Sequence, residues 1–293
     1  MRQLPDLSIR QFEYLTAVAD HPTWAVAAES VGVSPSALSQ GLAELERRLG
    51  VELFERTGRR RSLRSTASPV LDHARQVLAL TSDLVNWSDR LRSAEVGSIR
   101  VGMIDVAAVV HFPEVLRALR SERPDVGLHL TVAPSRLLLE HLLGGTLDVV
   151  VCVEPPMRPH GIGVEPLMTE PLVVIAPAGT DIGSPSTWGP WVLFPDGSHT
   201  RAQVEARLRH IGAPIRIAAE SHQPEVLAHM VGLGIGWTVL PDVQLPTAVC
   251  VARGPHLLER RLVTAVRSGA VRDPAAVELV DRLRFAAGVP GSR

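Results

Sequence analysis

The chain has 293 residues, 45% of them hydrophobic, which is enough to build two or three packed domains. It contains no apolar run of about 18 residues, and this excludes a membrane-spanning helix. The first residues show no basic-then-apolar signal segment, so we expect a cytoplasmic protein. The formal net charge is −1, and all 30 basic residues are arginine, a side chain well suited to phosphate contacts.

Residues 9–20 predict a first helix. Its apolar positions Phe12, Leu15, Val18 and Ala19 gather on one face. We expect this face to pack beneath the helices that follow, so the role of this helix is structural.

The next stretch predicts two short helices joined by a tight turn. Thr23 is a candidate N-cap for a helix over residues 24–31. Gly32 supplies the backbone freedom that the turn needs. The second helix begins with Ser34 as N-cap and Pro35 at the first helical position, where the missing N–H costs nothing.

This second helix has one apolar and one polar face. The apolar face consists of leucines at spacings of four, three and four: Leu38, Leu42, Leu45 and Leu49. The polar face begins with short, uncharged side chains: Ser36, Ser39 and Gln40. A recognition helix reads base edges with the residues of its first turns, and Gln matches the donor and acceptor of adenine. A small helical hairpin that only packs is the alternative interpretation of this stretch alone.

An arginine-rich segment follows. Residues 51–54 form a short apolar run that we expect to be a strand, and arginines then surround Gly58. Between residues 47 and 64 the chain has seven arginines and two glutamates. A basic hairpin placed directly after a recognition helix is typical of a wing that grips the DNA backbone. We therefore favour DNA binding over a solvated charged surface.

Together these residues resemble the winged helix-turn-helix of LysR-type transcriptional regulators. The pattern is carried by Ala27, Ala28, Val33, Ser34, Ser39, Leu45, Glu46, Leu49, Gly50, Leu53, Phe54 and Arg56. The resemblance implies a DNA-binding domain, which we place at residues 1–65. The candidate DNA contacts are Thr23, Ser34, Pro35, Ser36, Ser39, Gln40, Arg56, Arg59 and Arg60.

Residues 66–94 predict one long helix, within a linker and dimerisation segment over residues 66–95. Its positions follow the heptad spacing of a coiled coil: Val70, Ala74, Val77, Thr81, Leu84, Ser88 and Leu91, with Leu71, Leu78 and Val85 beside them. In the family the matching helix pairs two DNA-binding domains, which presents two recognition helices to an inverted repeat. The alternative is a helix that lies on its own domain. The family's usual Thr-x-x-Gly is replaced by Ser-Thr-Ala-Ser-Pro at residues 65–69.

From residue 96 to residue 293, strands alternate with helices, which is typical of an α/β fold. Expected strands cover residues 99–104, 127–132, 147–153, 172–176, 191–194, 215–219, 235–240, 248–251 and 261–266. Expected helices cover residues 113–120, 135–143, 200–211, 225–231 and 274–286. Apolar strands flanked by helices indicate a mostly parallel sheet covered on both faces. We place two lobes at residues 96–168 with 268–293 and at residues 169–267. The resemblance implies a periplasmic-binding-protein-like effector domain with its ligand between the lobes.

Ligands of α/β lobes lie at strand ends and helix N-termini. The candidate effector contacts at such points are Ile104, Asp105, Val106, Ser135, His199, Thr200, Arg201, Ser221, His222, Trp237 and Thr238. In the family, small hydroxyl residues often follow the first strand and hold an effector carboxylate, whereas this chain has Asp105. We therefore hypothesise that Asp105 pairs with an amine or hydroxyl of the effector, or that Thr200 and Arg201 capture an anion. The alternatives are an N-cap role for Asp105 and a core position for Trp237.

Other chemistries find little support in the sequence. Gly232, Gly234 and Gly236 follow a helix and open a strand, the reverse of a dinucleotide-binding loop. The 11 histidines show no metal-ligand spacing, and no grouping of Ser, His and acid indicates an enzyme, so we expect no metal or other cofactor. Cys152 and Cys250 lie in apolar runs, and we expect buried free thiols rather than a redox pair.

The sequence thus predicts a ligand-responsive, DNA-binding regulator of transcription. Its expected partners are double-stranded promoter DNA with an inverted repeat, a small-molecule effector, RNA polymerase and further copies of the chain. The coiled coil supports a homodimer, and the resemblance implies a homotetramer. Two other classes remain open: an architectural DNA-binding protein without a ligand, and a solute-binding or metabolic protein with an incidental helical N-terminus.

Overall fold

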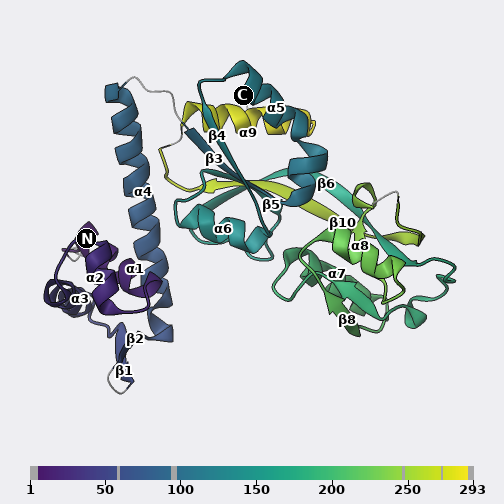
Figure 1. Ribbon diagram of the computed structural model, residues 1–293, viewed down its shortest axis with the longest axis horizontal. Helices are drawn as coiled ribbons and strands as arrows, with labels where there is room; N and C mark the ends of the chain where they lie inside the picture. The colour runs from purple at the N-terminus through teal and green to yellow at the C-terminus, as the bar shows by residue number, and fades with distance from the viewer. Residues whose placement is uncertain (1–5, 58–59, 94–97, 246–247, 272, 290–293) are drawn as a thin grey trace. The chain divides into compact units, whose positions relative to one another are not determined.

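The computed structural model describes residues 6–57, 60–93, 98–245, 248–271 and 273–289 (Figure 1). The chain divides into two compact units. The first comprises Met1–Ser93, Leu143–Thr146 and Gly269–Val271, and the second comprises the remaining residues. Among the residues described, no helix is both long and apolar enough to cross a bilayer.

The first unit is built from helices and one hairpin. In chain order its elements are α1 (Ile9–Asp20), α2 (Trp24–Ser30), α3 (Pro35–Leu49), β1 (Phe54–Thr57), β2 (Arg60–Leu63), a 3-10 turn at Ser65–Ala67 and α4 (Ser68–Ser93). The three predicted helices are confirmed almost to the residue. β1 pairs antiparallel with β2, which confirms the predicted hairpin, although residues 58–59 at its turn lie outside the described part.

Capping residues explain where α2 and α3 begin and where α3 ends. The hydroxyl oxygens of Thr23 and Ser34 accept hydrogen bonds from backbone N–H groups in the first turns of α2 and α3. Gly50 ends α3 in the left-handed region, at a φ of 70°. The predicted N-cap roles of both hydroxyl residues are thus confirmed.

The strand predicted over residues 51–54 is displaced, because β1 begins only at Phe54. A carboxylate oxygen of Glu46 accepts hydrogen bonds from the backbone N–H groups of Leu53 (2.7 Å) and Phe54 (3.1 Å). A side chain of α3 therefore satisfies these donors in place of a neighbouring strand. The apolar run alone predicted a strand that begins at residue 51, whereas the observed strand begins at Phe54.

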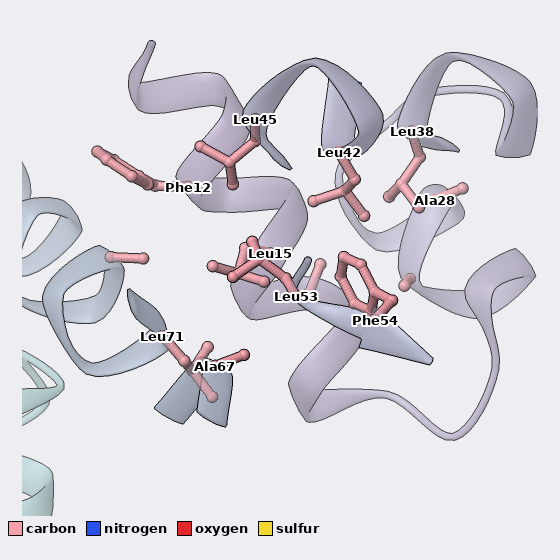
Figure 2. Packing of buried hydrophobic residues seen from close by; sticks show 13 residues of the cluster. Phe12, Leu15, Ala28, Leu38, Leu42, Leu45, Leu53, Phe54, Ala67 and Leu71 are labelled. Atoms are coloured by element: carbon pink, nitrogen blue, oxygen red, sulfur yellow. The ribbon is translucent and has the colours of Figure 1, made fainter. Parts of the chain in front are cut away.

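The core of the first unit is one apolar cluster (Figure 2). Its buried members are Phe12, Leu15, Ala17, Ala27, Ala28, Leu38, Leu42, Leu45, Leu53, Phe54, Ala67, Leu71 and Ala74. The leucine stripe of α3 faces inward as predicted, with Leu49 half buried at its end. Ala27 and Ala28 are fully buried, and their small side chains let the helices approach closely. Ala19, predicted on the inner face of α1, is exposed.

The first half of α4 packs against α1, since Leu71 and Ala74 are buried in this cluster and Val77 is half buried against it. That part of the predicted coiled-coil seam already has an intramolecular partner. Further along, Leu84 and Val85 are 50% and 51% exposed. Pairing of two α4 helices would cover this apolar stretch, and coiled-coil dimerisation stays a prediction.

The second unit is a mixed α/β structure. Its strands are β3 (Ser98–Met103), β4 (Gly127–Val132), β5 (Val149–Val153), β6 (Ile162–Pro177), β7 (Trp191–Leu193), β8 (Ile217–Glu220), β9 (Thr238–Pro241) and β10 (Val251–Arg267). Its helical elements are a π-helical turn (Ala107–His111), α5 (Pro113–Glu122), α6 (Ser135–Leu143), α7 (His199–His210), α8 (Pro224–Gly232), α9 (Pro274–Ala286) and 3-10 turns at Pro185–Thr187 and Asp242–Gln244. One sheet has the order β4-β3-β5-β10-β6-β9, and β7 pairs with β8 in a second sheet.

The long strands β6 and β10 connect two lobes (Figure 1). They pair antiparallel with each other along most of their length. β10 also pairs with β5 over residues 262–265, in the first lobe, and β6 pairs with β9 over residues 172–175, in the second lobe. Both strands therefore contribute to both lobes, and the lobe boundaries placed at residues 168/169 and 267/268 stay a prediction.

The first lobe has helices on both faces of its strands. β4, β3 and β5 run parallel, and every residue of β5 is buried. α5 and α9 lie on one face and α6 on the other (Figure 1). The prediction of a mostly parallel sheet is wrong, because β10, β6 and β9 pair antiparallel. A strand that leaves a lobe and a strand that returns to it must run in opposite directions.

The second lobe packs around three tryptophans. Trp237 stacks on Trp188 with ring centroids 6.0 Å apart, and Trp191 meets both rings edge-on. The strand predicted over residues 248–251 is wrong, because β10 begins at Val251. Cys250 consequently lies outside the sheet and is exposed, contrary to the expectation of a buried thiol.

Candidate functional site

The first candidate site is the N-terminal end of α3. The predicted contacts exposed on this end and on the neighbouring cap of α2 are Thr23, Ser34, Pro35, Ser36 and Gln40, while Ser39 is half buried. The hydroxyl oxygens of Ser34 and Ser36 lie 2.9 Å apart. Short, uncharged donors and acceptors suit base edges, and the positive end of the helix dipole favours a phosphate. The structure therefore presents the predicted recognition residues to solvent.

Contacts from α1 fix the position of this helix. A Cβ atom on Gly41 of α3 would lie 2.7 Å from two ring carbons of Tyr14, so a larger residue here would force the ring to move. The guanidinium of Arg10 lies 5.5 Å from the centre of the same ring and donates a hydrogen bond to the carbonyl oxygen of Val31 at 2.8 Å. α1 thereby holds both helices of the recognition motif.

The wing is anchored by residues that the sequence did not single out for this task. Besides the bonds to Glu46, the carbonyl oxygen of Phe54 accepts a hydrogen bond from Arg64 Nε at 3.3 Å. The ring of Phe54 meets Trp24 edge-on at 5.0 Å. Arg59 and the side chains of Arg56 and Arg60 lie outside the described part of the chain, so these predicted DNA contacts stay predictions. Glu46 entered the sequence analysis only as part of the family pattern.

The second candidate site lies between the two lobes. Val153, the last residue of β5, donates its backbone N–H to Ser135 Oγ at 3.2 Å, and its carbonyl oxygen lies 3.2 Å from His199 Nδ1. The structure thus brings together a predicted residue of α6 and a predicted residue of α7. Burial lowers the pKa of His199 more than the bond to Val153 raises it. A neutral ring that donates from Nδ1 presents Nε2 as an acceptor.

Thr200 belongs to a buried polar network between the lobes. Arg260 on β10 donates from Nε to Oε1 of Glu170 at 2.8 Å and from Nη1 to Thr200 Oγ1 at 3.0 Å. The other carboxylate oxygen of Glu170, on β6, lies 2.9 Å from His111 Nε2. The side chains of Glu170 and Arg260 are each 3% exposed. We refer to His111, Glu170, Arg260 and Thr200 as the hinge network.

The charge of Glu170 is maintained by its partners. Burial raises the pKa of this carboxyl, but the hydrogen bond from His111 and the charge and hydrogen bonds of Arg260 outweigh it, so the pKa lies below its ordinary value. Glu170 is therefore ionised at neutral pH. Sequence reasoning missed Glu170, Arg260 and His111, because partners 59 and 90 positions apart leave no local pattern.

Asp105 forms another contact between the lobes. Its Oδ2 accepts a hydrogen bond at 2.8 Å from Nε2 of Gln244, in the 3-10 turn that follows β9. The amide oxygen of Gln244 is buried and has no hydrogen-bond partner among the described residues. Asp105 lies inside the first helical turn after β3, not at the cap position, so the N-cap alternative is wrong. Gln244 carried no sequence signal.

Arg201 is engaged by several protein partners. Its guanidinium pairs with Glu205 at 2.7 Å and with Glu220, and it donates to the carbonyl oxygen of Phe194 at 3.2 Å. Glu205 also pairs with Arg209, so two carboxylates here face two guanidinium groups. The arrangement disfavours the hypothesis that Arg201 captures an anionic effector.

Ser221 and His222 lie at the end of β8. The hydroxyl oxygen of Ser221 accepts a hydrogen bond from the backbone N–H of Gln223 at 3.1 Å. His222 is exposed. Both side chains therefore lie ahead of α8, as the sequence predicted, with Ser221 shaping the turn into that helix.

Four predicted effector residues occupy the core instead. Ile104 and Val106 are 6% and 1% exposed, and Trp237 lies in the aromatic cluster of the second lobe. Thr238 is fully buried, and its hydroxyl oxygen has no hydrogen-bond partner within the described ranges. For Trp237, the core position weighed against a ligand contact is the one that the structure shows.

The cysteines are chemically dissimilar. Burial raises the pKa of the Cys152 thiol, within β5, to about 12, so it carries almost no thiolate at neutral pH. Cys250 is exposed. In the described part of the chain, no three His, Cys, Asp or Glu side chains are grouped so that they could hold a metal ion.

Comparison with known proteins covers nearly the whole chain. The pattern described as "Bacterial regulatory helix-turn-helix protein, lysR family" matches residues 9–68, and that described as "LysR substrate binding domain" matches residues 92–287. A probable hydrogen peroxide-inducible genes activator of Streptomyces viridosporus is 30% identical over 298 residues, which cover 95% of this chain and 94% of that protein. The HTH-type transcriptional regulator IlvR of Caulobacter vibrioides is 29% identical over 297 residues, covering 95% and 97%.

Solved structures share the fold. A full-length OxyR variant from Pseudomonas aeruginosa has a TM-score of 0.63 at 22% identity, covering 96% of this chain and 94% of that one. The structure of full-length CbnR complexed with its target DNA has a TM-score of 0.60 at 23% identity, covering 96% and 100%. The matched families are regulators and not enzymes. Because the substrate-binding pattern alone covers more than half of the chain and the helix-turn-helix pattern covers its N-terminal unit, this protein belongs to the LysR family of DNA-binding transcriptional regulators with an effector-binding domain.

Proposed function

We propose that this regulator binds promoter DNA through the exposed start of α3 and the wing, and that a small molecule bound between the lobes controls the outcome. The observation that carries the proposal is the uncharged polar end of α3, presented to solvent by a closed apolar core. The setting is the cytoplasm, where the promoter DNA lies.

The proposed DNA contacts are Thr23, Ser34, Pro35, Ser36, Ser39 and Gln40 from the helices and Arg56, Arg59 and Arg60 from the wing. Gln40 is the proposed base reader, because an exposed carboxamide donates and accepts at once. Arg59 is proposed to contact phosphate, which supplies affinity for any sequence. The hydroxyl of Ser34 caps α3, so a DNA contact there would add to a structural role.

We propose that the effector lies near Asp105, Ser135, His199 and Thr200, where the lobes meet. The carboxylate of Asp105 and the unpartnered amide oxygen of Gln244 are both acceptors, and one hydrogen bond joins the two side chains. Neighbouring acceptors favour a ligand with N–H or O–H donors and disfavour a carboxylate. An amine or a polyhydroxy compound is therefore the proposed class of effector.

The proposed mechanism is a population shift. An effector that binds one arrangement of the lobes more tightly increases the fraction of molecules in that arrangement. α4 is proposed to pair two chains, and two such dimers are proposed to form a tetramer, so that a change in the effector domains alters the spacing of recognition helices on DNA. Contact with RNA polymerase is a further proposed step.

The similarity to a peroxide-inducible activator raises a thiol response as a second possibility. It has little support in this chain, which contains 2 cysteines. Cys152 is buried and its raised pKa keeps it protonated, so the exposed Cys250 has no reactive partner within the chain. We therefore propose a non-covalent effector.

The test is fluorescence-anisotropy binding of the full chain to the intergenic DNA beside its own gene and to random DNA, over a range of salt. Tight, selective binding with a steep salt dependence is expected. Equal binding to both DNAs would favour an architectural role or a distant target. No binding at low salt would contradict the proposed role of α3 and the wing.

A further inference from the structure

One short segment of the first lobe is bonded at both of its ends to other parts of the effector domain. At its start, Asp105 accepts a hydrogen bond from Gln244 of the second lobe. At its end, His111 bonds to Glu170 on the connecting strand β6. A shift of the backbone between Asp105 and His111 would therefore alter both contacts.

The backbone between them is not a regular α-helix. The N–H of Phe112 donates to the carbonyl oxygen of Ala107 at 2.9 Å, the spacing of a π-helix, whereas the N–H of Ala108 donates to Ile104 at 3.1 Å in ordinary α-helical spacing. Single π-turns are rare and frequently mark functional positions. The outer side of this turn is uncovered, since Val109 is 72% exposed. Its inner side is anchored in the core, since Val106 and Ala107 are 1% and 0% exposed.

The hinge network continues from His111 into the second lobe. One carboxylate oxygen of Glu170 bonds to His111 and the other to Arg260. Arg260 also donates from Nη1 to Thr200, in the first turn of α7. Glu170 and Arg260 are also direct partners in the β6–β10 ladder. Because the pair is 3% exposed, water cannot replace a lost contact. A displacement of His111 must change the bonding of Arg260 and hence of Thr200.

We propose that His111, Glu170 and Arg260 are positioning residues that transmit occupancy of the Asp105 site to the first turn of α7. This inference rests on the proposed function, because it names how an effector at Asp105 alters the arrangement of the lobes. A ligand donor that takes Asp105 from Gln244 moves the π-helical segment, and His111 carries that movement to the connecting strands.

Amide hydrogen exchange of the full chain tests this coupling without a known effector, because exchange reports local opening. His111→Leu keeps most of the side-chain volume but removes the donor to Glu170. It should raise exchange about tenfold in residues 105–112 and also in residues 199–204 of the other lobe. His111→Gln keeps an N–H close to the position of Nε2 and should leave both peptides near wild type.

A substitution at Thr200, at the other end of the hinge network, tests the coupling in the opposite direction. Thr200→Val removes the acceptor of Arg260 at nearly constant shape and should raise exchange in residues 105–112 by a few-fold. Glu259→Gln is the control outside the hinge network, on an exposed neighbour of Arg260, and should leave residues 105–112 near wild type. A rise confined to the lobe that carries the substitution, or the same rise in His111→Gln, would contradict the proposal.

The buried strand β5 provides the internal reference. If its exchange rose as much as that of residues 199–204 in His111→Leu, the domain would have lost stability as a whole, and this too would contradict specific coupling. Asp105→Ala should raise exchange at residues 199–204 in the wild-type background and add nothing in His111→Leu. If the exchange increases of the two substitutions were additive, Asp105 would not act through His111.

Promoter binding by the wild-type chain separates this inference from the proposed function. Coupled exchange without DNA binding would retain the network and remove the regulator model proposed above. DNA binding with uncoupled exchange would retain the regulator and remove the network.

Discussion

The DNA-binding end and the junction of the lobes bury opposite kinds of chemistry. The core beneath α3 is mainly apolar, and the polar side chains at the start of the helix are exposed. Between the lobes, an arginine and a glutamate are almost completely buried, and the contacts around them are hydrogen bonds. Apolar contacts have no preferred direction, whereas the hydrogen bonds of a buried ion pair depend on the orientation of each donor and acceptor. The first region is therefore held together mainly by packing, and the second mainly by directional polar contacts.

Breaking the buried pair should produce the largest effect. Glu170→Ala leaves the guanidinium of Arg260 buried without its counter-ion, which costs about 3–5 kcal/mol of unfolding free energy. Urea denaturation monitored by tryptophan fluorescence measures this loss. The double variant Glu170→Leu with Arg260→Met should recover most of it, because the pair is then replaced by apolar groups. A loss no larger than that of Glu259→Gln would show that the pair is not critical to the fold.

Truncation of a core side chain beneath the recognition helix should lower the free energy of unfolding by somewhat less. Leu42 is fully buried, and Leu42→Ala should remove about 2–5 kcal/mol of stability from the first unit. DNA binding should fall equally for specific and random sequences, because the whole surface is lost. Val26→Ala, at a position 40% exposed in α2, is the control and should change little. A purely sequence-selective loss in Leu42→Ala would mean that the core does more than support the surface.

Substitutions on the DNA face should act on binding and not on folding. Gln40→Ala should cost about 1–3 kcal/mol at one base pair and relax the preference there. Arg59→Ala should weaken binding to all sequences and lower the salt slope by about 1. Anisotropy titrations on matched and mismatched DNA distinguish the two. Equal losses on specific and random DNA for Gln40→Ala would remove it as a base reader.

A change of pH near neutrality should have the smallest effect on stability, and it should act through Glu170 at the junction of the lobes. The pKa of Glu170 is lowered in the folded chain, so its contribution to stability is complete above the ordinary carboxyl pKa of about 4.3 and is lost as the pH falls through the lower, folded pKa. The stability difference between wild type and Glu170→Gln should stay constant from pH 8 to about pH 5 and shrink below it. Urea midpoints across this range measure it. A difference that vanished near pH 6 would assign the dependence to another group.

Local patterns predicted the first unit well. The stripe of leucines in α3 and the hydroxyl caps act over a few residues, so their structural result follows from neighbours in the chain. The displaced start of β1 shows the limit of such patterns. Glu46 satisfies the N–H groups of Leu53 and Phe54 from another element, and an apolar run carries no trace of that bond.

In the second unit the helix boundaries were largely predictable, but the directions of the strands and the polar contacts were not. Ser135, His199 and Thr200 were selected because side chains at strand ends and helix starts meet in α/β folds, and all three lie at the junction. For Trp237 the sequence favoured a core position over a ligand contact, and the structure places it in the core.

The family, the recognition helix, the wing hairpin and the alternation of strands and helices could all be predicted, since each depends on the spacing of residues along the chain. Which polar groups face one another between the lobes emerged from the folded chain alone. The Glu170–Arg260 pair joins residues 90 positions apart, and the Gln244–Asp105 bond joins residues 139 apart. Such contacts follow from the crossing of two long strands and the turns beside them, and no local periodicity records where that crossing places a side chain.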